Sequence, residues 1–293
     1  MTTVGQWVEG ARPRTLPAAI SPVLVGTGAA AAADGFRPGP ALLALVVALA
    51  LQVAVNYAND YSDGVRGTDA VRVGPLRLVG SGVSTPAAVK RAALAAFAVA
   101  AVAGLVLAAL TTWWLVAVGA VAMLAAWFYT GGSRPYGYRA LGEISVFVFF
   151  GLVATLGTTY VQLERIPAAA VGGGIACGAL ACAILVVNNL RDIPTDTVAA
   201  KRTLAVVLGD RRTRVLYGTL VAVAFVVVLV LAPALPWVLL ALAAVPLAVR
   251  PVRIVAAGRL GRELVPVLRD TGRLQLAYAV LLAIGLALSQ VPN

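Results

Sequence analysis

The sequence predicts an all-α integral membrane protein with about nine transmembrane helices. Of its 293 residues, 61% are hydrophobic and only 12% are charged, and histidine is absent. Several apolar runs reach the roughly 20 residues that a helix needs to cross a bilayer. Little of the chain is left for a soluble domain, so we treat residues 1–293 as a single transmembrane domain.

Nine apolar runs account for the predicted spans. In chain order they lie at approximately 16–34, 40–58, 88–110, 113–130, 143–161, 168–188, 213–232, 234–250 and 272–290. Two connections are short, Thr111-Thr112 and Pro233 to Pro236, so the helices that they join are predicted to be antiparallel. The first eight spans divide into two similar four-helix halves, at about 16–130 and 143–250, and the ninth span is left over.

The distribution of positive charge predicts the orientation of these helices. With a cytoplasmic N-terminus, the cytoplasmic segments are 1–15, 59–87, 131–142, 189–212 and 251–273. All but two of the 23 basic residues then lie in these segments or at the adjoining helix edges, the exceptions being Arg37 and Arg165. Cytoplasmic loops are enriched in Lys and Arg, which explains the net charge of +11. No stripe of basic and aromatic residues indicates a nucleic-acid partner.

Two polar segments follow apolar runs on the predicted cytoplasmic side. The first extends from Asn56 to Asp69 and the second from Asn188 to Asp196. Both contain Asn-x-x-x-Asp followed by a further Asp, at Asn59, Asp63 and Asp69 and at Asn188, Asp192 and Asp196. Asn and Asp are also common as helix caps and turn formers. The repetition of one spacing at two helix ends favours a shared site instead.

Helical spacing brings the polar groups of each segment together. Asn56, Asn59, Asp60 and Asp63 follow the i, i+3, i+4, i+7 pattern of a single helix face. Gly64 and Gly67 are expected to weaken the helix and let the chain return Asp69 to the same place. In the second segment we expect Pro194 to bend or end the helix, so that Asp196 is presented from the following turn.

The chemistry of these side chains predicts a cation. Crowded carboxylates at neutral pH must share protons or cations, and sites built only from oxygen favour Mg²⁺ or Ca²⁺ over Zn²⁺. Mg²⁺ usually takes one or two carboxylates and completes its shell with water and substrate phosphates. Two such clusters beside a membrane therefore predict Mg²⁺ bound around a lipid diphosphate.

These segments resemble the two Asp-rich motifs of UbiA-type intramembrane prenyltransferases. The likeness covers about residues 6–272 and is carried by four stretches: Ala11 to Pro17, Asn59 to Asp69, Tyr129 to Tyr138 and Asn188 to Asp196. Within the superfamily, the motifs are most similar to those of the subfamily that prenylates 1,4-dihydroxy-2-naphthoate. Five residues separate Asp63 from Asp69 where the general pattern has three. This longer spacing resembles the naphthoate subfamily and leaves the contact of Asp69 open.

The resemblance implies nine helices around a central cavity, a side opening for the isoprenoid tail, and two Mg²⁺ ions that bridge the diphosphate to both motifs. The implied metal residues are Asn59, Asp63, Asp69, Asn188, Asp192 and Asp196, to which the helical spacing adds Asp60. Asp63, Asp192 and Asp196 are the catalytic candidates. The implied reaction transfers a polyprenyl group from polyprenyl diphosphate to 1,4-dihydroxy-2-naphthoate. It releases CO₂ and pyrophosphate and gives demethylmenaquinone for menaquinone biosynthesis.

Seven further residues are candidates for binding substrate. Five cations would hold the diphosphate: Arg12, Arg66, Arg134, Arg191 and Lys201. Tyr129 and Tyr136 would shield the allylic cation or contact the acceptor ring. Each has a simpler alternative, because basic and aromatic residues are common at membrane edges. The implied location is the cell membrane (inner or plasma), as a multi-pass protein whose active site faces the cytoplasm.

Three alternatives compete with this interpretation, and the first of them fails on the sequence. A CDP-alcohol phosphotransferase shares the Asp60-x-x-Asp63-Gly64 start of its motif, but the residues that should follow are absent. A cation-binding transporter is expected to carry its acids near mid-helix, whereas these lie at helix ends. Within the superfamily, 4-hydroxybenzoate, haem or chlorophyll-type acceptors are the competing substrates. Prenyl chain length and oligomeric state stay open.

Overall fold

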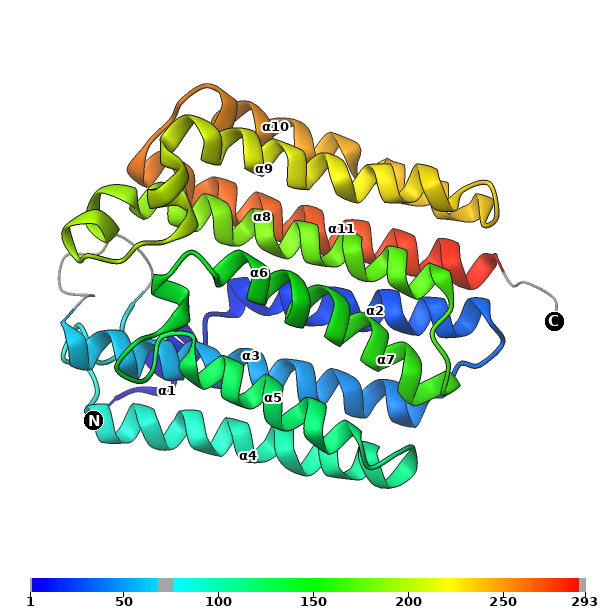
Figure 1. Ribbon diagram of the computed structural model, residues 1–293, viewed down its shortest axis with the longest axis horizontal. Coiled ribbons are helices and arrows are strands. Elements are labelled where there is room, and N and C mark those ends of the chain that lie inside the picture. Colours follow the sequence, from blue (N-terminus) through cyan, green and yellow to red (C-terminus); the bar gives the residue numbers. More distant parts are fainter. Residues whose placement is uncertain (1, 68–75, 290–293) are drawn as a thin grey trace.

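A computed structural model describes residues 2–67 and 76–289, and in this part of the chain the secondary structure is helical apart from one isolated bridge between Arg139 and Arg202 (Figure 1). The helices of the first half are α1 (Val4–Gly10), α2 (Leu16–Ala32), α3 (Pro38–Arg66), α4 (Pro86–Leu110) and α5 (Leu115–Phe128). Those of the second half are α6 (Gly142–Val146), α7 (Ala154–Leu163), α8 (Ala168–Val198), α9 (Leu204–Leu231), α10 (Val245–Ala256) and α11 (Val265–Leu288). A π-helix, Phe147–Val153, joins α6 to α7, and a 3-10 helix, Pro236–Ala244, leads into α10.

The number of spans is close to the predicted nine. Among the described residues, eight helical segments are long and apolar enough to cross a membrane. A shorter apolar helix, Trp114–Phe128, stands where the fourth span was predicted. The helices lie roughly parallel to the long axis of the molecule, so each connection falls at one of its two ends (Figure 1).

The two helices that carry the polar segments are longer than predicted. α3 continues eight residues beyond the expected end at 58, and α8 continues ten residues beyond the expected end at 188. Gly67 does end α3, in the left-handed conformation with φ 74° that glycine adopts readily. Gly64 lies inside the helix, where a Cβ atom would come within 2.5 Å of Val79. It therefore permits close packing of the following loop and does not break the helix.

The predicted effect of Pro194 is wrong. α8 runs through this proline to Val198, so Asp192 and Asp196 lie on one continuous helix. Proline removes one N–H group from the backbone ladder, but α8 is the most enclosed of the candidate spans, with 72% of its apolar window buried. The packing around α8 thus overrides the tendency of Pro194 to bend or end the helix.

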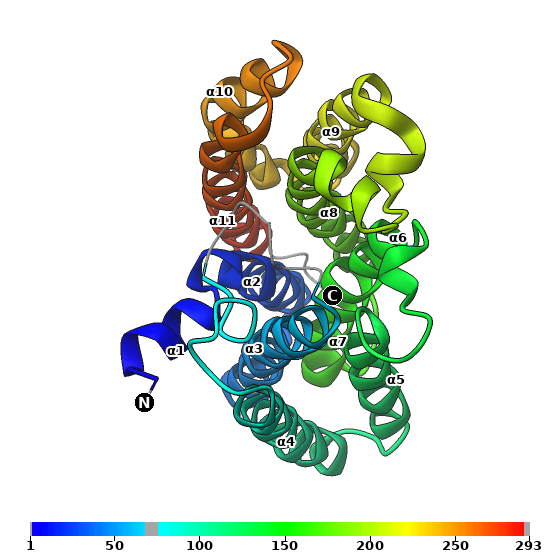
Figure 2. The same ribbon diagram turned by 90° about the vertical axis from the view of Figure 1, so that its left-hand side faces the viewer.

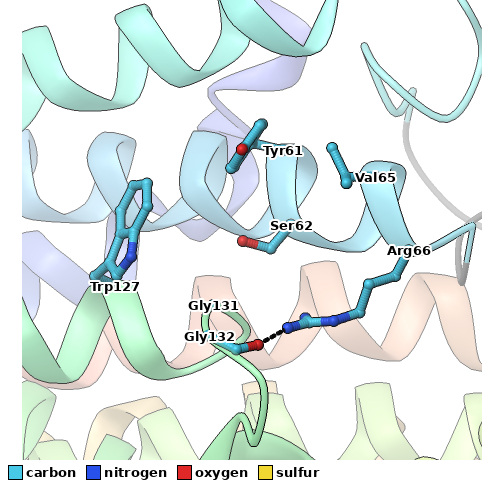
Figure 3. A pocket seen from close by; sticks show the side chains of 7 residues that line it. All are labelled: Tyr61, Ser62, Val65, Arg66, Trp127, Gly131 and Gly132. Carbon is cyan, nitrogen blue, oxygen red and sulfur yellow. Dashed lines mark hydrogen bonds between the residues drawn. The ribbon is translucent and has the colours of Figure 1, made fainter.

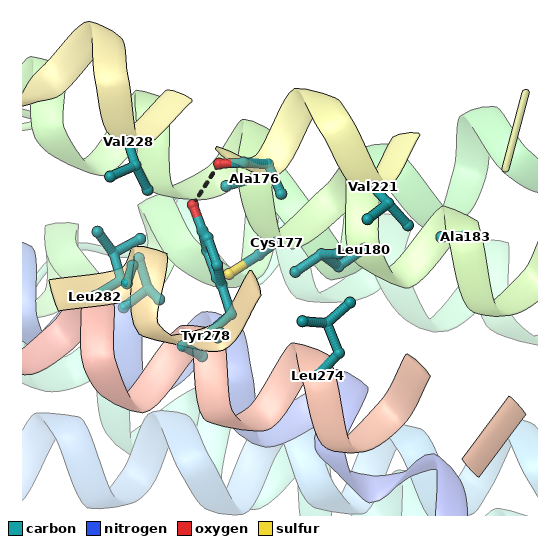
Figure 4. Packing of buried hydrophobic residues seen from close by; sticks show 14 of the residues in the cluster. Ala176, Cys177, Leu180, Ala183, Val221, Val228, Leu274, Tyr278 and Leu282 are labelled. Atoms are coloured by element: carbon teal, nitrogen blue, oxygen red, sulfur yellow. Dashed lines mark hydrogen bonds between the residues drawn. The ribbon is translucent and has the colours of Figure 1, made fainter. Parts of the chain in front are cut away.

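The apolar core joins α8 to α9, α10 and α11. In Figure 4 the Tyr278 ring lies among Cys177, Leu180 and Leu282, and its hydroxyl donates a 2.7 Å hydrogen bond to the Ala224 carbonyl oxygen. Cys177 and Cys182 are both free and buried, as expected of packing residues.

Small residues allow a close helix crossing. A Cβ atom on Gly151 would lie 2.5 Å from the Cα atom of Gly178. Membrane helices pack tightly through such small residues because lipid offers no hydrophobic drive for association.

Candidate active site

Both acidic segments lie at the same end of the molecule. α3 and α8 each finish there, on the left in Figure 1, together with the loop between α5 and α6. Figure 2 looks onto this end and shows α2, α3 and α8 toward the interior, with α4, α9 and α10 toward the outside. Residues more than a hundred positions apart in sequence therefore share one surface of the bundle.

In the first segment, Asn59 and Asp63 are held by the loop that follows α5. Thr130 donates its hydroxyl hydrogen to Asn59 Oδ1 at 2.8 Å, and Tyr138 donates its hydroxyl hydrogen to Asp63 Oδ1 at 2.6 Å. Asp63 is only 3% exposed. These contacts orient two oxygen-bearing side chains on one face of α3 before any ligand binds.

Asp60 and Asn56 are engaged with other parts of the backbone. The carboxylate of Asp60 accepts N–H hydrogen bonds from Leu78 at 2.8 Å and Val79 at 3.0 Å. Asn56 donates to the Ala11 carbonyl at 2.8 Å and to Thr15 Oγ1 at 3.0 Å. The two side chains therefore hydrogen-bond α3 to the segment before α4 and to the segment after α1. Asp69 lies outside the described residues.

The second segment carries its own positive charge. Arg191 binds both carboxylate oxygens of Asp192, with Nε 2.7 Å from Oδ1 and Nη2 2.8 Å from Oδ2, and also donates to Asn188 Oδ1 at 2.9 Å. The Arg191 and Asp192 side chains are each 3% exposed. One turn further on, Lys201 Nζ lies 3.9 Å from Asp196 Oδ1. Arg191 and Lys201, both predicted from sequence, thus touch the acids of this segment.

Tyr138 connects the two segments. Its hydroxyl binds Asp63 of α3, while Lys201 Nζ sits 4.9 Å from its ring centroid and pairs with Asp196 of α8. The guanidinium carbon of Arg66 lies 5.7 Å from the same ring. Cation–π contacts of this length are favourable. Tyr138 therefore links the first acidic motif to the second through Lys201.

The remaining predicted residues lie on the loop between α5 and α6 and just after α1. Tyr129 and Tyr136 form an edge-to-face pair with centroids 5.5 Å apart. Tyr136 donates to the Ala125 carbonyl at 2.7 Å and is 2.9 Å from Ser145 Oγ, and its burial raises the pKa of the phenol, so it stays protonated. Arg134 is exposed on the loop, and Arg12 adopts a left-handed backbone with φ 55° at the end of the N-terminal segment.

Comparison with known proteins identifies the family. The model of the UbiA prenyltransferase family matches residues 19–263. The chain belongs to this family. It is 57% identical to 1,4-dihydroxy-2-naphthoate octaprenyltransferase of Mycobacterium tuberculosis, over 99% of this chain and 100% of that protein. It is also 39% identical to the Escherichia coli protein of the same name, over 97% and 96% of the two chains.

Solved structures of UbiA homologues share the fold. One from Aeropyrum pernix superposes with a TM-score of 0.69 at 16% identity, covering 94% of this chain and 98% of its own. Another, from Archaeoglobus fulgidus and bound to GPP and Mg²⁺, superposes with a TM-score of 0.67 at 16% identity, covering 98% and 100%. The all-helical architecture predicted for this UbiA chain is therefore confirmed.

The donor set of this UbiA chain suits a magnesium ion that is shared with a ligand. Within residues 2–67 and 76–289, no three His, Cys, Asp or Glu side chains gather into a metal cage. The oxygen donors near these helix ends are amide and carboxylate groups, from Asn59 and Asp63 on α3 and from Asn188, Asp192 and Asp196 on α8. Because Mg²⁺ needs only one or two carboxylates when phosphate completes its shell, these residues fit the ion.

Sequence reasoning missed two contributors to this region. Tyr138 was part of the recognised loop, but nothing in its spacing singled it out from Tyr129 and Tyr136. Glu143 is 8% exposed and accepts a 3.0 Å hydrogen bond from Asn189 Nδ2, which ties the start of α6 to the residue beside Asn188. From its place beside Gly142 at the start of a predicted span, the sequence indicated only a structural carboxylate at a helix N-terminus.

Proposed function

We propose that this protein transfers a polyprenyl group from a polyprenyl diphosphate to 1,4-dihydroxy-2-naphthoate, with loss of CO₂ and pyrophosphate. The observation that supports it most is the Tyr138 connection, which brings two acidic motifs of a UbiA chain to one place. The naphthoate acceptor is supported by the names of relatives up to 57% identical over the full chain.

Diphosphate binding is assigned to the facing ends of α3 and α8. Asn59 and Asp63 on one side, and Asn188, Asp192 and Asp196 on the other, would hold two Mg²⁺ ions together with the diphosphate. When bound, Mg²⁺ acts as a Lewis acid that neutralises the charge growing on the departing pyrophosphate. We place Asp69 in the same set, as the family motif implies.

The cations of the site contribute to charge balance. Lys201 is positioned between Asp196 and the Tyr138 ring and can donate hydrogen bonds to a phosphate oxygen that approaches this surface. Arg191 neutralises Asp192 through two hydrogen bonds. Diphosphate and Mg²⁺ together can replace that pairing, which would let Asp192 turn toward the metal and Arg191 toward phosphate. Arg12 and Arg134 are assigned to the rim.

Asp60 receives a structural role in this proposal. With both carboxylate oxygens bonded to backbone N–H groups of Leu78 and Val79, it anchors the chain that returns from the first motif. That anchor fixes where the segment between α3 and α4 re-enters the bundle, and so the position of the acids that precede it.

The proposed site faces the cytoplasm of the cell membrane. The N-terminus and the acidic ends of α3 and α8 lie at one end of the bundle, the end that also carries most of the basic residues (Figure 1). The positive-inside tendency assigns that end to the cytoplasm. Polyprenyl diphosphate would then present its headgroup at this surface with its tail in the bilayer.

Purified protein in liposomes tests this function. It is given one polyprenyl diphosphate, Mg²⁺ and either 1,4-dihydroxy-2-naphthoate or 4-hydroxybenzoate, and prenylated product, CO₂ and pyrophosphate are measured. We expect equal amounts of all three from the naphthoate and none after chelation of Mg²⁺. Product from 4-hydroxybenzoate alone would overturn the acceptor assignment, and absence of pyrophosphate release with either acid would overturn the transfer itself.

A further inference from the structure

A cavity of about 230 Å³ lies between the last turns of α3 and the end of α5, beside the first acidic motif (Figure 3). Its lining includes two aromatic rings, a hydroxyl and a guanidinium, from Tyr61, Trp127, Ser62 and Arg66, with Val65 at the rim. Pockets for drug-sized ligands measure about 300–1,000 Å³. The cavity therefore suits a smaller molecule.

The walls of the cavity favour a flat ring. Tyr61 and Trp127 are stacked with centroids 6.2 Å apart and planes inclined by 30°. The centroid of the Phe97 ring lies 6.4 Å from that of Trp127, and Lys90 Nζ lies 5.7 Å from the Tyr61 centroid. Aromatic faces held in this way offer stacking and edge contacts to an aromatic ligand.

The polar end of the cavity favours a carboxylate. Arg66 donates hydrogen bonds to the carbonyl oxygens of Thr130 and Gly132, which fix the plane of its guanidinium. A guanidinium carries five N–H donors, so an anchored Arg66 keeps donors for a ligand. Planar carboxylates bind Arg through paired hydrogen bonds. Ser62 adds a buried hydroxyl next to this group.

One layer of side chains separates the cavity from Asn59 and Asp63 of the first segment. Thr130 gives its carbonyl oxygen to Arg66 and its hydroxyl hydrogen to Asn59. Arg66 also lies 5.7 Å from the ring of Tyr138, whose hydroxyl binds Asp63. A molecule in the cavity would therefore sit directly beside the groups assigned to the diphosphate.

We propose that this cavity binds the aromatic acid acceptor, with its fused rings against Tyr61 and Trp127 and its carboxylate at Arg66. The inference rests on the proposed function and deepens it, because it places the second substrate. It also moves Arg66 from the diphosphate, where the sequence assigned it, to the acceptor.

Occluding the cavity tests the proposal. Val65 is 60% exposed at the rim, so Val65→Trp fills the space without disturbing a packed core. Val102→Trp on α4, 63% exposed, is the matched control. In liposomes we expect Val65→Trp to raise KM for 1,4-dihydroxy-2-naphthoate about tenfold, on the scale of one lost aromatic contact. KM for polyprenyl diphosphate should stay at the control value.

Arg66→Lys provides a second variant if Val65→Trp fails to fold. It keeps the charge and loses the planar pair of donors, so KM should rise for the naphthoate acid and stay unchanged for 1,4-dihydroxynaphthalene, which lacks the carboxylate. Equal effects on both acceptors, or on both substrates of the reaction, would overturn the assignment. So would naphthoate kinetics of Val65→Trp that match the control.

A binding measurement separates this inference from the proposed function. Naphthoate added without diphosphate should quench tryptophan fluorescence in the wild type, and Trp127→Phe should remove most of the change. If the wild type forms no product, the proposed function fails, while quenching that depends on Trp127 still supports the cavity. If product forms and Trp127→Phe quenches like the wild type, the cavity assignment fails alone.

Discussion

Tyr138 is held between charges that belong to both acidic motifs. Its hydroxyl reaches Asp63 on α3 and its ring faces Lys201, the partner of Asp196 on α8. Neither contact is visible in the sequence, because they join positions 75 and 63 residues apart. The types of residue in the site were predictable from motif spacing; the side chain that connects them required the fold.

Removing the Tyr138 hydroxyl should impair catalysis more than folding. Hydrogen bonds to charged groups contribute about 1.5–3 kcal/mol, so Tyr138→Phe is expected to lower kcat/KM roughly 10- to 100-fold and to raise the Mg²⁺ concentration needed for half-maximal rate. Steady-state kinetics in liposomes check this. Tyr57→Phe is the control, since its hydroxyl binds the Trp7 carbonyl at 2.8 Å on the same helix. Identical Mg²⁺ curves for both variants would argue against the positioning role.

The two motif aspartates should respond differently to alanine. Asp63→Ala and Asp192→Ala are both expected to abolish turnover. Asp192→Ala also leaves the buried charge of Arg191 without its carboxylate partner. Breaking a buried ion pair lowers the free energy of unfolding by about 3–5 kcal/mol. The melting temperature of Asp192→Ala in detergent should therefore fall well below that of Asp63→Ala. Adding Arg191→Met should recover stability without activity. Equal melting temperatures for the two single variants would show that the buried charge of Arg191 does not need Asp192 for its compensation.

At the scale of helices, apolarity predicted where the spans lie better than how far each helix extends, since α9 begins at Leu204 and not at the expected position 213. The expected ends at 58 and 188 mark the onset of polar residues, yet α3 and α8 continue to Arg66 and Val198. A helix can leave the hydrocarbon as long as its polar groups find partners, as Asp60 does at Leu78 and Val79. Pro194 is a second case in which a rule based on local sequence fails, since the burial of α8 overrides the helix-breaking tendency of proline.

The crossing of the π-helix with α8 should tolerate no added methyl group. Gly151→Ala would place Cβ 2.5 Å from Gly178 Cα, and overpacking of this kind costs about 1–3 kcal/mol. Gly119→Ala on α5 meets nothing within 4 Å and should gain about 0.5–1 kcal/mol from the better helix former. In the same detergent, the melting temperature should fall below that of the wild type for Gly151→Ala and rise above it for Gly119→Ala. A shift of the same sign and size in both would contradict the close crossing.

For the whole molecule, the all-helical membrane class followed from composition, because a chain that is 61% hydrophobic has few other ways to fold, and the apolar runs gave the approximate number of spans. The division into two similar halves and the arrangement around a central cavity stay predictions. The aromatic cavity beside α3 was not foreseen, since Tyr61 and Trp127 are 66 positions apart and meet only through packing.

Orientation in the membrane can be measured with introduced thiols. Cys177 and Cys182 are buried and should stay unlabelled in the native protein. Ser81→Cys lies in the exposed connection before α4, and Ile166→Cys lies 47% exposed at the opposite end. In intact cells a membrane-impermeant maleimide should label Ile166→Cys at once and Ser81→Cys only after lysis. Labelling of Ser81→Cys in intact cells, and of Ile166→Cys only after lysis, would reverse the proposed orientation in the membrane.

The length of α3 and α8 bears on how products depart. With 29 and 31 residues at about 1.5 Å each, both helices exceed the roughly 30 Å of hydrocarbon in a bilayer. Their acidic ends therefore stand at the border with water. In the proposed reaction, inorganic diphosphate would dissolve into the aqueous side while the greasy quinone precursor diffuses sideways among lipids. The diphosphate would not have to cross the lipid, and the quinone precursor would not have to cross water. Release of one product therefore need not precede release of the other.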